Sequence, residues 1–149
     1  MIKSLIILRG LAGSGKSTFS RVNFNNFIVC SADHYFELKT GSYVFDPRQI
    51  SSAHAYCHGK LTGLMEAQYP YCLLDNTNTQ LWEYKWAIEL AKVHQYEVKV
   101  ISLFDGGLTD SQLAARNAHG VPIESIAKMR ARWQKDPAEV SAEAYLKEA

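Results

Sequence analysis

Residues 10–18 read GLAGSGKST and follow LIIL, the apolar run of residues 5–8, with Arg9 between them. The pattern Gly-x-x-x-x-Gly-Lys-Ser is the signature of a phosphate-binding loop, in which glycines let backbone N–H groups turn inward around an anion. We expect Lys16 to reach the outer phosphates of ATP and Ser17 to hold Mg²⁺, the two cofactors that this loop implies. The loop then opens a helix, whose N-terminus also favours negative charge. The residues expected to bind the nucleotide are Gly10, Ala12, Gly13, Ser14, Gly15, Lys16, Ser17 and Thr18.

The composition is typical of a globular protein. The chain has 149 residues, of which 47% are hydrophobic and 21% charged, and this length suits a single domain over residues 1–149. No apolar run approaches the roughly 18 residues of a membrane span, and the first residues lead into a short strand rather than a signal peptide. The 3 cysteines form no CxxC pair, which is typical of reduced thiols. We therefore expect a cytoplasmic protein with no membrane contact, and the sequence indicates no protein partner.

Strands and helices alternate along the first two thirds of the chain. Apolar runs predict strands, Pro47 after an Asp46 cap predicts a helix start, and the glycines at 59 and 63 predict a weak point in that helix. Parallel strands joined by helices imply an α/β fold, with a parallel sheet covered by helices on both faces. The predicted strands are residues 4–9, 27–30, 71–74 and 97–104, and the predicted helices are about 16–22, 47–69 and 80–94. Residues 34–46 are predicted to form a loop that could hold a short helical turn.

A basic helical hairpin is predicted at about residues 109–135. Its two helices, 109–118 and 122–134, are expected to form a lid that closes over a triphosphate and excludes water. Arg116 is the arginine that we expect to reach the developing charge, with Arg130 and Arg132 as alternatives. The segment after the lid, residues 136–149, is acidic, and residues 140–146 could form a terminal helix. This uneven charge indicates a localised anion site more than a broad nucleic-acid surface.

Polar clusters follow the second and third predicted strands. Ligands of parallel sheets bind beyond the carboxyl ends of the strands, so these clusters are expected to meet the phosphate-binding loop. Asp33 is the predicted carboxylate for an acceptor hydroxyl, and its alternative role is a turn or helix cap. Asp75 is expected to hold Mg²⁺ through water. Asn76 and Asn78 could orient the acceptor or stiffen the loop, and for Asn78 a structural asparagine turn is an equal alternative.

Two further features leave alternatives open. Aromatic side chains after Asp33 could stack on a base or close the core under a long loop. His54 and His58 have a helical spacing that can hold zinc, but no third ligand is evident, which favours partly buried histidines. The aromatic residues concerned are Tyr35, Phe36, Tyr43 and Phe45.

The order of these motifs resembles a family of small P-loop kinases related to polynucleotide 5′-hydroxyl kinases. The resemblance covers residues 5–133 and includes phage polynucleotide kinase and a kinase domain in a ubiquitin-ligase-binding protein of animals. It implies a three-layer P-loop kinase fold with a helical lid, Asp33 as general base and Arg116 in the lid. Phe36 and Asn76 depart from the phage enzyme, which has an arginine and an aspartate there. The motifs are CSADHYF (30–36), FDP…AH.YC (45–57), LLDNTNT.LWE (73–83) and RNAHGVPIESIAKMRARW (116–133).

Residues and resemblance together predict an ATP-dependent kinase that transfers the γ-phosphate to an acceptor hydroxyl, first of all the 5′-hydroxyl of DNA or RNA. A small-molecule kinase for a nucleoside or sugar is an alternative, because such kinases share the fold and the position of the base. A second alternative is a nucleotide-binding regulator or ATPase. Asp33 discriminates against that alternative, because a switch needs a positioned water and not an acceptor carboxylate.

Overall fold

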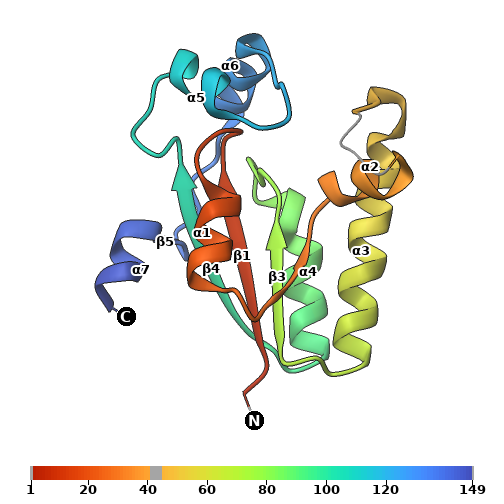
Figure 1. Ribbon diagram of the computed structural model, residues 1–149. Coiled ribbons are helices and arrows are strands. Elements are labelled where there is room, and N and C mark those ends of the chain that lie inside the picture. The colour runs from red at the N-terminus through yellow and green to blue at the C-terminus, as the bar shows by residue number, and fades with distance from the viewer. Residues whose placement is uncertain (1, 41–44, 149) are drawn as a thin grey trace.

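The sheet that organises the molecule has five parallel strands in the order β2-β3-β1-β4-β5 (Figure 1). The computed structural model describes residues 2–40 and 45–148. β1 (Ser4–Gly10) lies in the centre, between β3 (Tyr71–Asp75) and β4 (Glu97–Phe104). The edge strands are β2 (Ile28–Cys30) and β5 (Val140–Ser141). The predicted parallel α/β sheet is confirmed, and β5 is a strand that the sequence did not predict.

Helices cover both faces of this sheet. α1 (Lys16–Asn23) and α7 (Ala142–Glu148) lie on one face, and α3 (Ile50–Glu66) and α4 (Trp82–Val93) lie on the other (Figure 1). Each pair of helices buries its own apolar cluster against the strands, so the strands carry apolar side chains on both sides. The three layers place the carboxyl ends of all five strands at a common edge.

β1 shows how the sequence produces these layers. Leu5 and Ile7 pack in the cluster under α3 and α4, whereas Ile6 and Leu8 pack in the cluster under α1 and α7. Successive side chains of a strand point to opposite faces, so an unbroken apolar run is what a strand buried on both faces requires. All four side chains are buried.

The lid consists of α5 (Asp110–Arg116) and α6 (Ile123–Arg132), which lie above the loop that joins β1 to α1 (Figure 1). A separate small core of buried Leu11, Leu113 and Ile126 holds the lid on this loop. Because Leu11 belongs to the phosphate-binding loop itself, the lid is packed directly on the loop that it was predicted to cover.

Within the predicted loop at residues 34–46 the helical turn is longer than expected, because the first half forms the helix α2 (Asp33–Thr40). The Ser31 hydroxyl accepts a hydrogen bond from the backbone N–H of Asp33 at 3.2 Å, and this capping starts the helix.

The predicted weak point in α3 is absent, since α3 is continuous over residues 50–66. Glycine costs a helix only about 1 kcal/mol, and buried side chains on the sheet side of α3 offset that cost. The predicted Asp46 cap is confirmed, because its side chain accepts from the Arg48 N–H.

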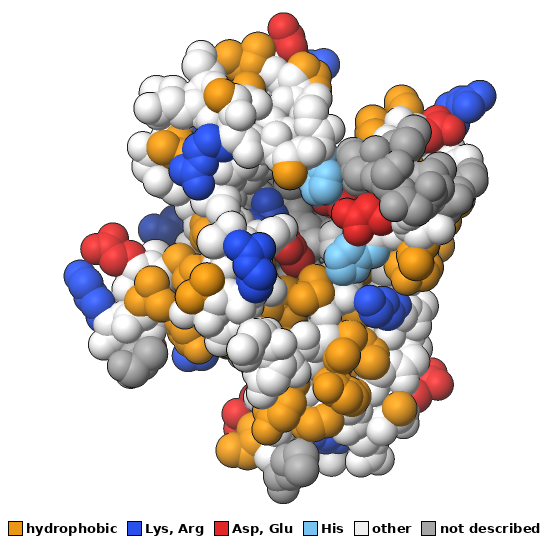
Figure 2. Space-filling model, in the orientation of Figure 1, with side chains coloured by type: hydrophobic (Ala, Val, Ile, Leu, Met, Phe, Trp, Pro, Cys, Tyr) orange, Lys and Arg blue, Asp and Glu red, His pale blue; other side chains and the backbone are white. Residues whose placement is uncertain are grey.

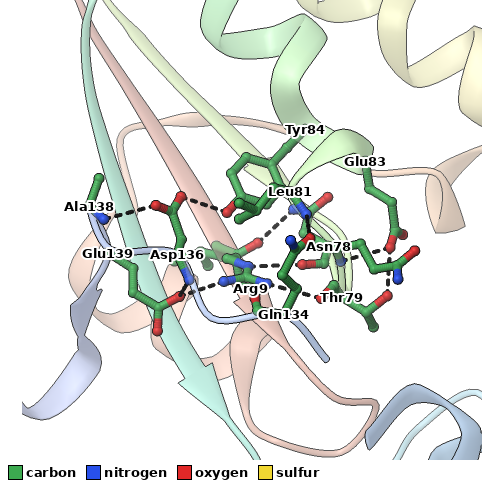
Figure 3. Close-up of polar contacts among 12 residues, drawn as sticks. Arg9, Asn78, Thr79, Leu81, Glu83, Tyr84, Gln134, Asp136, Ala138 and Glu139 are labelled. Atoms are coloured by element: carbon green, nitrogen blue, oxygen red, sulfur yellow. Dashed lines mark hydrogen bonds and ion pairs between the residues drawn. The ribbon is translucent and has the colours of Figure 1, made fainter. Parts of the chain in front are cut away.

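Arg9, the residue before the phosphate-binding loop, is a fully buried cation, and Figure 3 shows its polar contacts. Its guanidinium pairs with Glu139 from the acidic C-terminal segment and lies 4.3 Å from the centroid of the Trp133 ring. Its Nε donates to the carbonyl of Asn78 at 2.8 Å, and its Nη2 donates to the carbonyl of Thr79 at 3.1 Å. Arg9 therefore ties β1, the loop after β3 and the end of the lid together, and it does not serve an anion site.

Removing the partner of Arg9 is expected to destabilise the protein strongly. Glu139→Ala leaves a buried guanidinium without its carboxylate, and such a loss costs about 3 kcal/mol of unfolding free energy. Glu143→Ala is the matched control, because Glu143 is exposed and pairs only with exposed Lys147. Denaturant unfolding of the two variants measures the difference. Equal stability of the two variants would contradict the structural role of the Arg9–Glu139 pair.

Candidate active site

The loops after β1 and β2 and the end of β3 enclose a cleft of about 520 Å³ at the carboxyl edge of the sheet. Figure 2 shows a hollow in which basic, acidic and histidine side chains gather. Parallel sheets bind their ligands at this edge. The structure thus brings the predicted polar clusters together. Of the predicted site residues, the cleft lining contains Ala12, Gly13, Gly15, Lys16, Ser17, Thr18, Asp33, Asp75, Asn76 and Arg116.

The phosphate-binding loop depends on glycine at two positions. Gly13 and Gly15 have φ angles of 83° and 102°, in the left-handed region that favours glycine. A Cβ on Gly13 would also lie 2.4 Å from the carbonyl oxygen of Leu113, so any side chain there would push the lid away. Two of the predicted nucleotide contacts lie outside the cleft lining, namely Gly10 at the end of β1 and Ser14, which is buried beneath the loop.

Backbone donors of this loop are available to an anion. No described residue accepts a hydrogen bond from the backbone N–H groups of Gly13, Gly15, Lys16 or Ser17, all of which line the cleft. Buried backbone donors are nearly always paired in proteins, so a row of unpaired ones at a helix N-terminus fits a phosphate chain. A triphosphate therefore fits the residues present.

Lys16 lies at the mouth of α1 with its ammonium folded back on the loop. Its Nζ donates to the carbonyls of Gly10 at 2.8 Å and Leu11 at 3.3 Å. Burial lowers the pKa of Lys16, while the carboxylates of Asp75 and Asp33 act in the opposite direction. A bound phosphate would add a third anion and favour the charged ammonium further.

Ser17 and Asp75, the predicted Mg²⁺ residues, lie together. The Ser17 hydroxyl donates to Asp75 Oδ2 at 3.5 Å, and Asp75 closes β3 in a buried position. Burial raises the pKa of Asp75, and the nearby Lys16 cation opposes that rise. A hydroxyl, one carboxylate and phosphate oxygens are the ligands that Mg²⁺ takes in phosphate-transfer sites, so this pair fits the ion.

Asp33 faces the cradle from the other side of the cleft, at the start of α2. Its carboxylate is 46% exposed, and its Oδ2 lies 3.6 Å from Nε2 of His119, which belongs to the turn of the lid. Both side chains line the cleft. The sequence predicted Asp33 for this side of the cleft but did not single out His119 as a site residue.

The two asparagines after β3 have different surroundings. Asn76 lines the cleft, and its Oδ1 accepts from the backbone N–H of Ala32 at 3.0 Å, so it fixes the segment that leads to Asp33. Asn78 is buried, has a φ angle of 48°, and its Nδ2 donates to the carbonyl of Leu8 at 2.8 Å. The structure does not bring Asn78 into the cleft lining, which favours the structural turn over an acceptor contact.

Among the three lid arginines, Arg116 lines the cleft. Its Nη2 lies 3.9 Å from the position that a Cβ on Gly15 would take, directly over the phosphate-binding loop. Arg130 instead pairs with Asp105 at 2.7 Å and with Asp110 at 2.8 Å. Arg132 donates through Nε to the Thr79 hydroxyl at 3.0 Å and is absent from the lining. Within the described part of the chain, Arg116 has no ion-pair partner, and of the three arginines it is the one in the cleft lining.

The remaining candidates divide between core and cleft. Phe36 is buried and packs on Tyr35, whereas Phe45 lines the cleft; Tyr43 lies outside the described residues. His54 also lines the cleft, and His58 stacks on the Trp86 ring with centroids 3.6 Å apart.

The three cysteines are free and buried, and burial raises each thiol pKa, to about 12 for Cys30. None of the described helices has the length and apolar character needed to cross a bilayer.

A parallel sheet with a glycine-rich loop after its central strand and a helical hairpin packed on that loop defines a kinase-like P-loop fold. The chain superposes on a solved Pnkp1/Rnl/Hen1 RNA repair complex with a TM-score of 0.69, over 88% of this chain and 44% of that one, at 19% identity. It superposes on the APS kinase CysC of Mycobacterium tuberculosis, solved with AMPPNP and APS, with a TM-score of 0.60, over 95% and 90% of the two chains, at 12% identity. At such identities the likeness shows the fold.

The family model described as an AAA domain matches residues 5–135, and the chain belongs to this family. It is 34% identical over 139 residues to NEDD4-binding protein 2 of Homo sapiens, which covers 88% of this chain and 8% of that protein. It is 29% identical over 139 residues to 2′,3′-cyclic-nucleotide 3′-phosphodiesterase of Mus musculus, covering 90% of this chain and 32% of that enzyme. The chain thus spans less than a third of either relative. These comparisons confirm the resemblance to the polynucleotide kinase-like P-loop family.

Proposed function

We propose that the protein is an ATP- and Mg²⁺-dependent kinase that transfers the γ-phosphate to an acceptor hydroxyl, first of all a polynucleotide 5′-hydroxyl. The observation that carries the proposal is the position of Asp33 in the same cleft as Lys16. Phosphate transfer to an alcohol needs a phosphate cradle, a metal and a carboxylate that receives the hydroxyl proton. All three sets of residues share this one cleft.

Each group of cleft residues has its own role in the proposed phosphate transfer. The unpaired N–H groups of the loop and the Lys16 ammonium bind the phosphates, and Ser17 with Asp75 would hold Mg²⁺. Mg²⁺, when bound, neutralises charge on the phosphate oxygens. Asp33 accepts the proton of the acceptor hydroxyl as the oxygen attacks phosphorus, and ADP leaves. Arg116 stabilises the negative charge on the transferring group.

A small uncharged acceptor, such as a nucleoside or sugar, is the second candidate. Among the described residues, Lys16 and Arg116 are the only Lys or Arg side chains in the lining, and both lie on the phosphate side. The acceptor side holds Asp33, Glu37 and histidines. A polynucleotide backbone is normally bound through several cations, so this distribution is the observation in favour of a small acceptor. The likeness to the polynucleotide kinase-like family is what keeps the 5′-hydroxyl as the first candidate. A panel of 5′-hydroxyl oligonucleotides, nucleosides and sugars separates the candidates.

Lys16→Ala is expected to weaken ATP binding by about 10–100-fold, because a hydrogen bond to a charged group contributes about 1.5–3 kcal/mol. The fold should persist, since the ammonium contacts only two loop carbonyls. Calorimetric titration with Mg–ATP measures the dissociation constant. Lys85→Ala is the matched control, because Lys85 is exposed on α4 and pairs with Glu89. Wild-type ATP affinity in Lys16→Ala would contradict the role of the loop as the phosphate cradle.

A further inference from the structure

The turn that joins α5 to α6 reaches both sides of the cleft. At its start Arg116 lies over Gly15 of the phosphate-binding loop. Within the same turn, His119 Nε2 lies 3.6 Å from Oδ2 of Asp33. One short segment of the lid therefore contacts the phosphate side and the acceptor side at the same time.

Asn117 makes this turn rigid. Its Nδ2 donates to the carbonyls of Ala114 and Val121, each at 3.0 Å, and its Oδ1 accepts from the Val121 N–H at 2.7 Å. α5 is in turn fixed on the phosphate-binding loop, because Leu113 packs against Leu11. The position of His119 is thus coupled to the seating of the lid on the loop.

The His119 imidazole is suited to orient the carboxylate. A distance of 3.6 Å is slightly longer than a hydrogen bond, so a small side-chain rotation brings Nε2 into donating range of Oδ2. Both side chains stay reachable from the cleft, with 29% of His119 and 46% of Asp33 exposed.

We propose that His119 is a positioning residue that holds the Asp33 carboxylate toward the acceptor hydroxyl. Binding of the acceptor would then depend on the lid being packed on the phosphate-binding loop. The inference rests on the proposed kinase function and deepens it. Arg116 acts on the phosphates and His119 acts on the acceptor through Asp33. The two lid residues should therefore affect different kinetic constants.

The test compares His119→Ala and His119→Gln with wild type in steady-state transfer to the best acceptor of the panel. His119→Ala should lower kcat/KM for the acceptor by about 10–100-fold, the range of a hydrogen bond to a charged group. The Kd for Mg–ATP should change by less than about twofold. His119→Gln should recover part of the loss, because its side-chain amide also donates. His94→Ala is the matched control, since His94 caps the far end of α4.

A double-mutant cycle makes the test sharper. If His119 acts through Asp33, His119→Ala should add little to the defect of Asp33→Asn. An equal loss in both backgrounds, a wild-type acceptor kcat/KM, or an ATP affinity that falls as much as acceptor efficiency would overturn the inference. If the kinase proposal itself is wrong, wild-type protein will label no acceptor. That result would overturn the kinase proposal and the role of His119 together.

Discussion

Arg116→Ala is expected to lower the rate of phosphate transfer by about 10³–10⁵-fold, while the Kd for ATP changes much less. An arginine that engages the transferring phosphate contributes mainly to the transition state, and groups of this kind supply rate factors in that range. Arg116 lies over the phosphate-binding loop, and Arg130 is held by two aspartates and cannot replace it. Single-turnover transfer from γ-labelled ATP, with calorimetric ATP binding, measures both quantities.

Two control variants bracket this prediction. Arg48→Ala removes an exposed arginine that pairs with Asp46, and it should leave transfer unchanged. Arg130→Ala should instead lower the melting temperature, because it breaks the pairs with Asp105 and Asp110. Normal turnover in Arg116→Ala together with a large loss in Arg132→Ala would assign the role to Arg132 and contradict the geometry.

Asp33→Asn is expected to slow transfer to the acceptor by about 10²–10⁴-fold and to leave ATP binding in place. The amide keeps the shape of the carboxylate but cannot accept the hydroxyl proton, and general bases contribute about this much. The backbone N–H of residue 33 still donates to the Ser31 hydroxyl in this variant, so the stability of α2 should hold. Transfer rate and melting temperature are measured on the same preparation.

The competing role of Asp33 is structural alone, as the acidic residue in the first turn of α2. In that case Asp33→Ala would cost about 1 kcal/mol of unfolding free energy and leave the chemistry intact. Asp46→Ala provides the comparison, since Asp46 caps the 3₁₀ turn η1 (Pro47–Gln49) that precedes α3. It should lower stability without lowering the transfer rate. An Asp33 variant that behaves like Asp46→Ala would remove Asp33 from the mechanism.

The grouping of the cleft residues could be predicted because it follows from local pattern and topology. An apolar run before the glycine-rich loop identifies β1, and polar residues at the ends of parallel strands share one edge. This reasoning places Ser17 near Asp75, which lies 58 positions away, and the structure joins them at 3.5 Å. It needs no knowledge of side-chain packing.

Long-range pairs of charged residues were not predictable in the same way. Arg9 directly precedes the phosphate-binding loop, but its partner Glu139 lies 130 positions away in a segment with no strong pattern. The contact of His119 with Asp33 also depends on how the lid sits on the sheet, which no local spacing encodes. The sequence pointed to this contact only by placing a polar residue in the turn of the lid.

The helix α2 could not be predicted from local sequence pattern for a different reason. Its residues have no clear helical periodicity, and mixed polar and aromatic residues are typical of a loop. The Ser31 hydroxyl accepts from the Asp33 N–H locally, but the helix is also held by the burial of the Phe36 ring, and that burial depends on the finished fold. The role of Asn78 also depends on the finished fold, because its side-chain amide donates to the carbonyl of Leu8 on the neighbouring strand and not to a ligand.

The fate of the γ-phosphate tests the central claim most directly. γ-Labelled Mg–ATP is incubated with wild-type protein and the acceptor panel, and label in acceptor is separated from label released as inorganic phosphate. The kinase proposal predicts label in at least one hydroxyl acceptor, with this transfer lost in Asp33→Asn. Release of all label as inorganic phosphate, at equal rates in wild type and Asp33→Asn, would contradict it and indicate an ATPase.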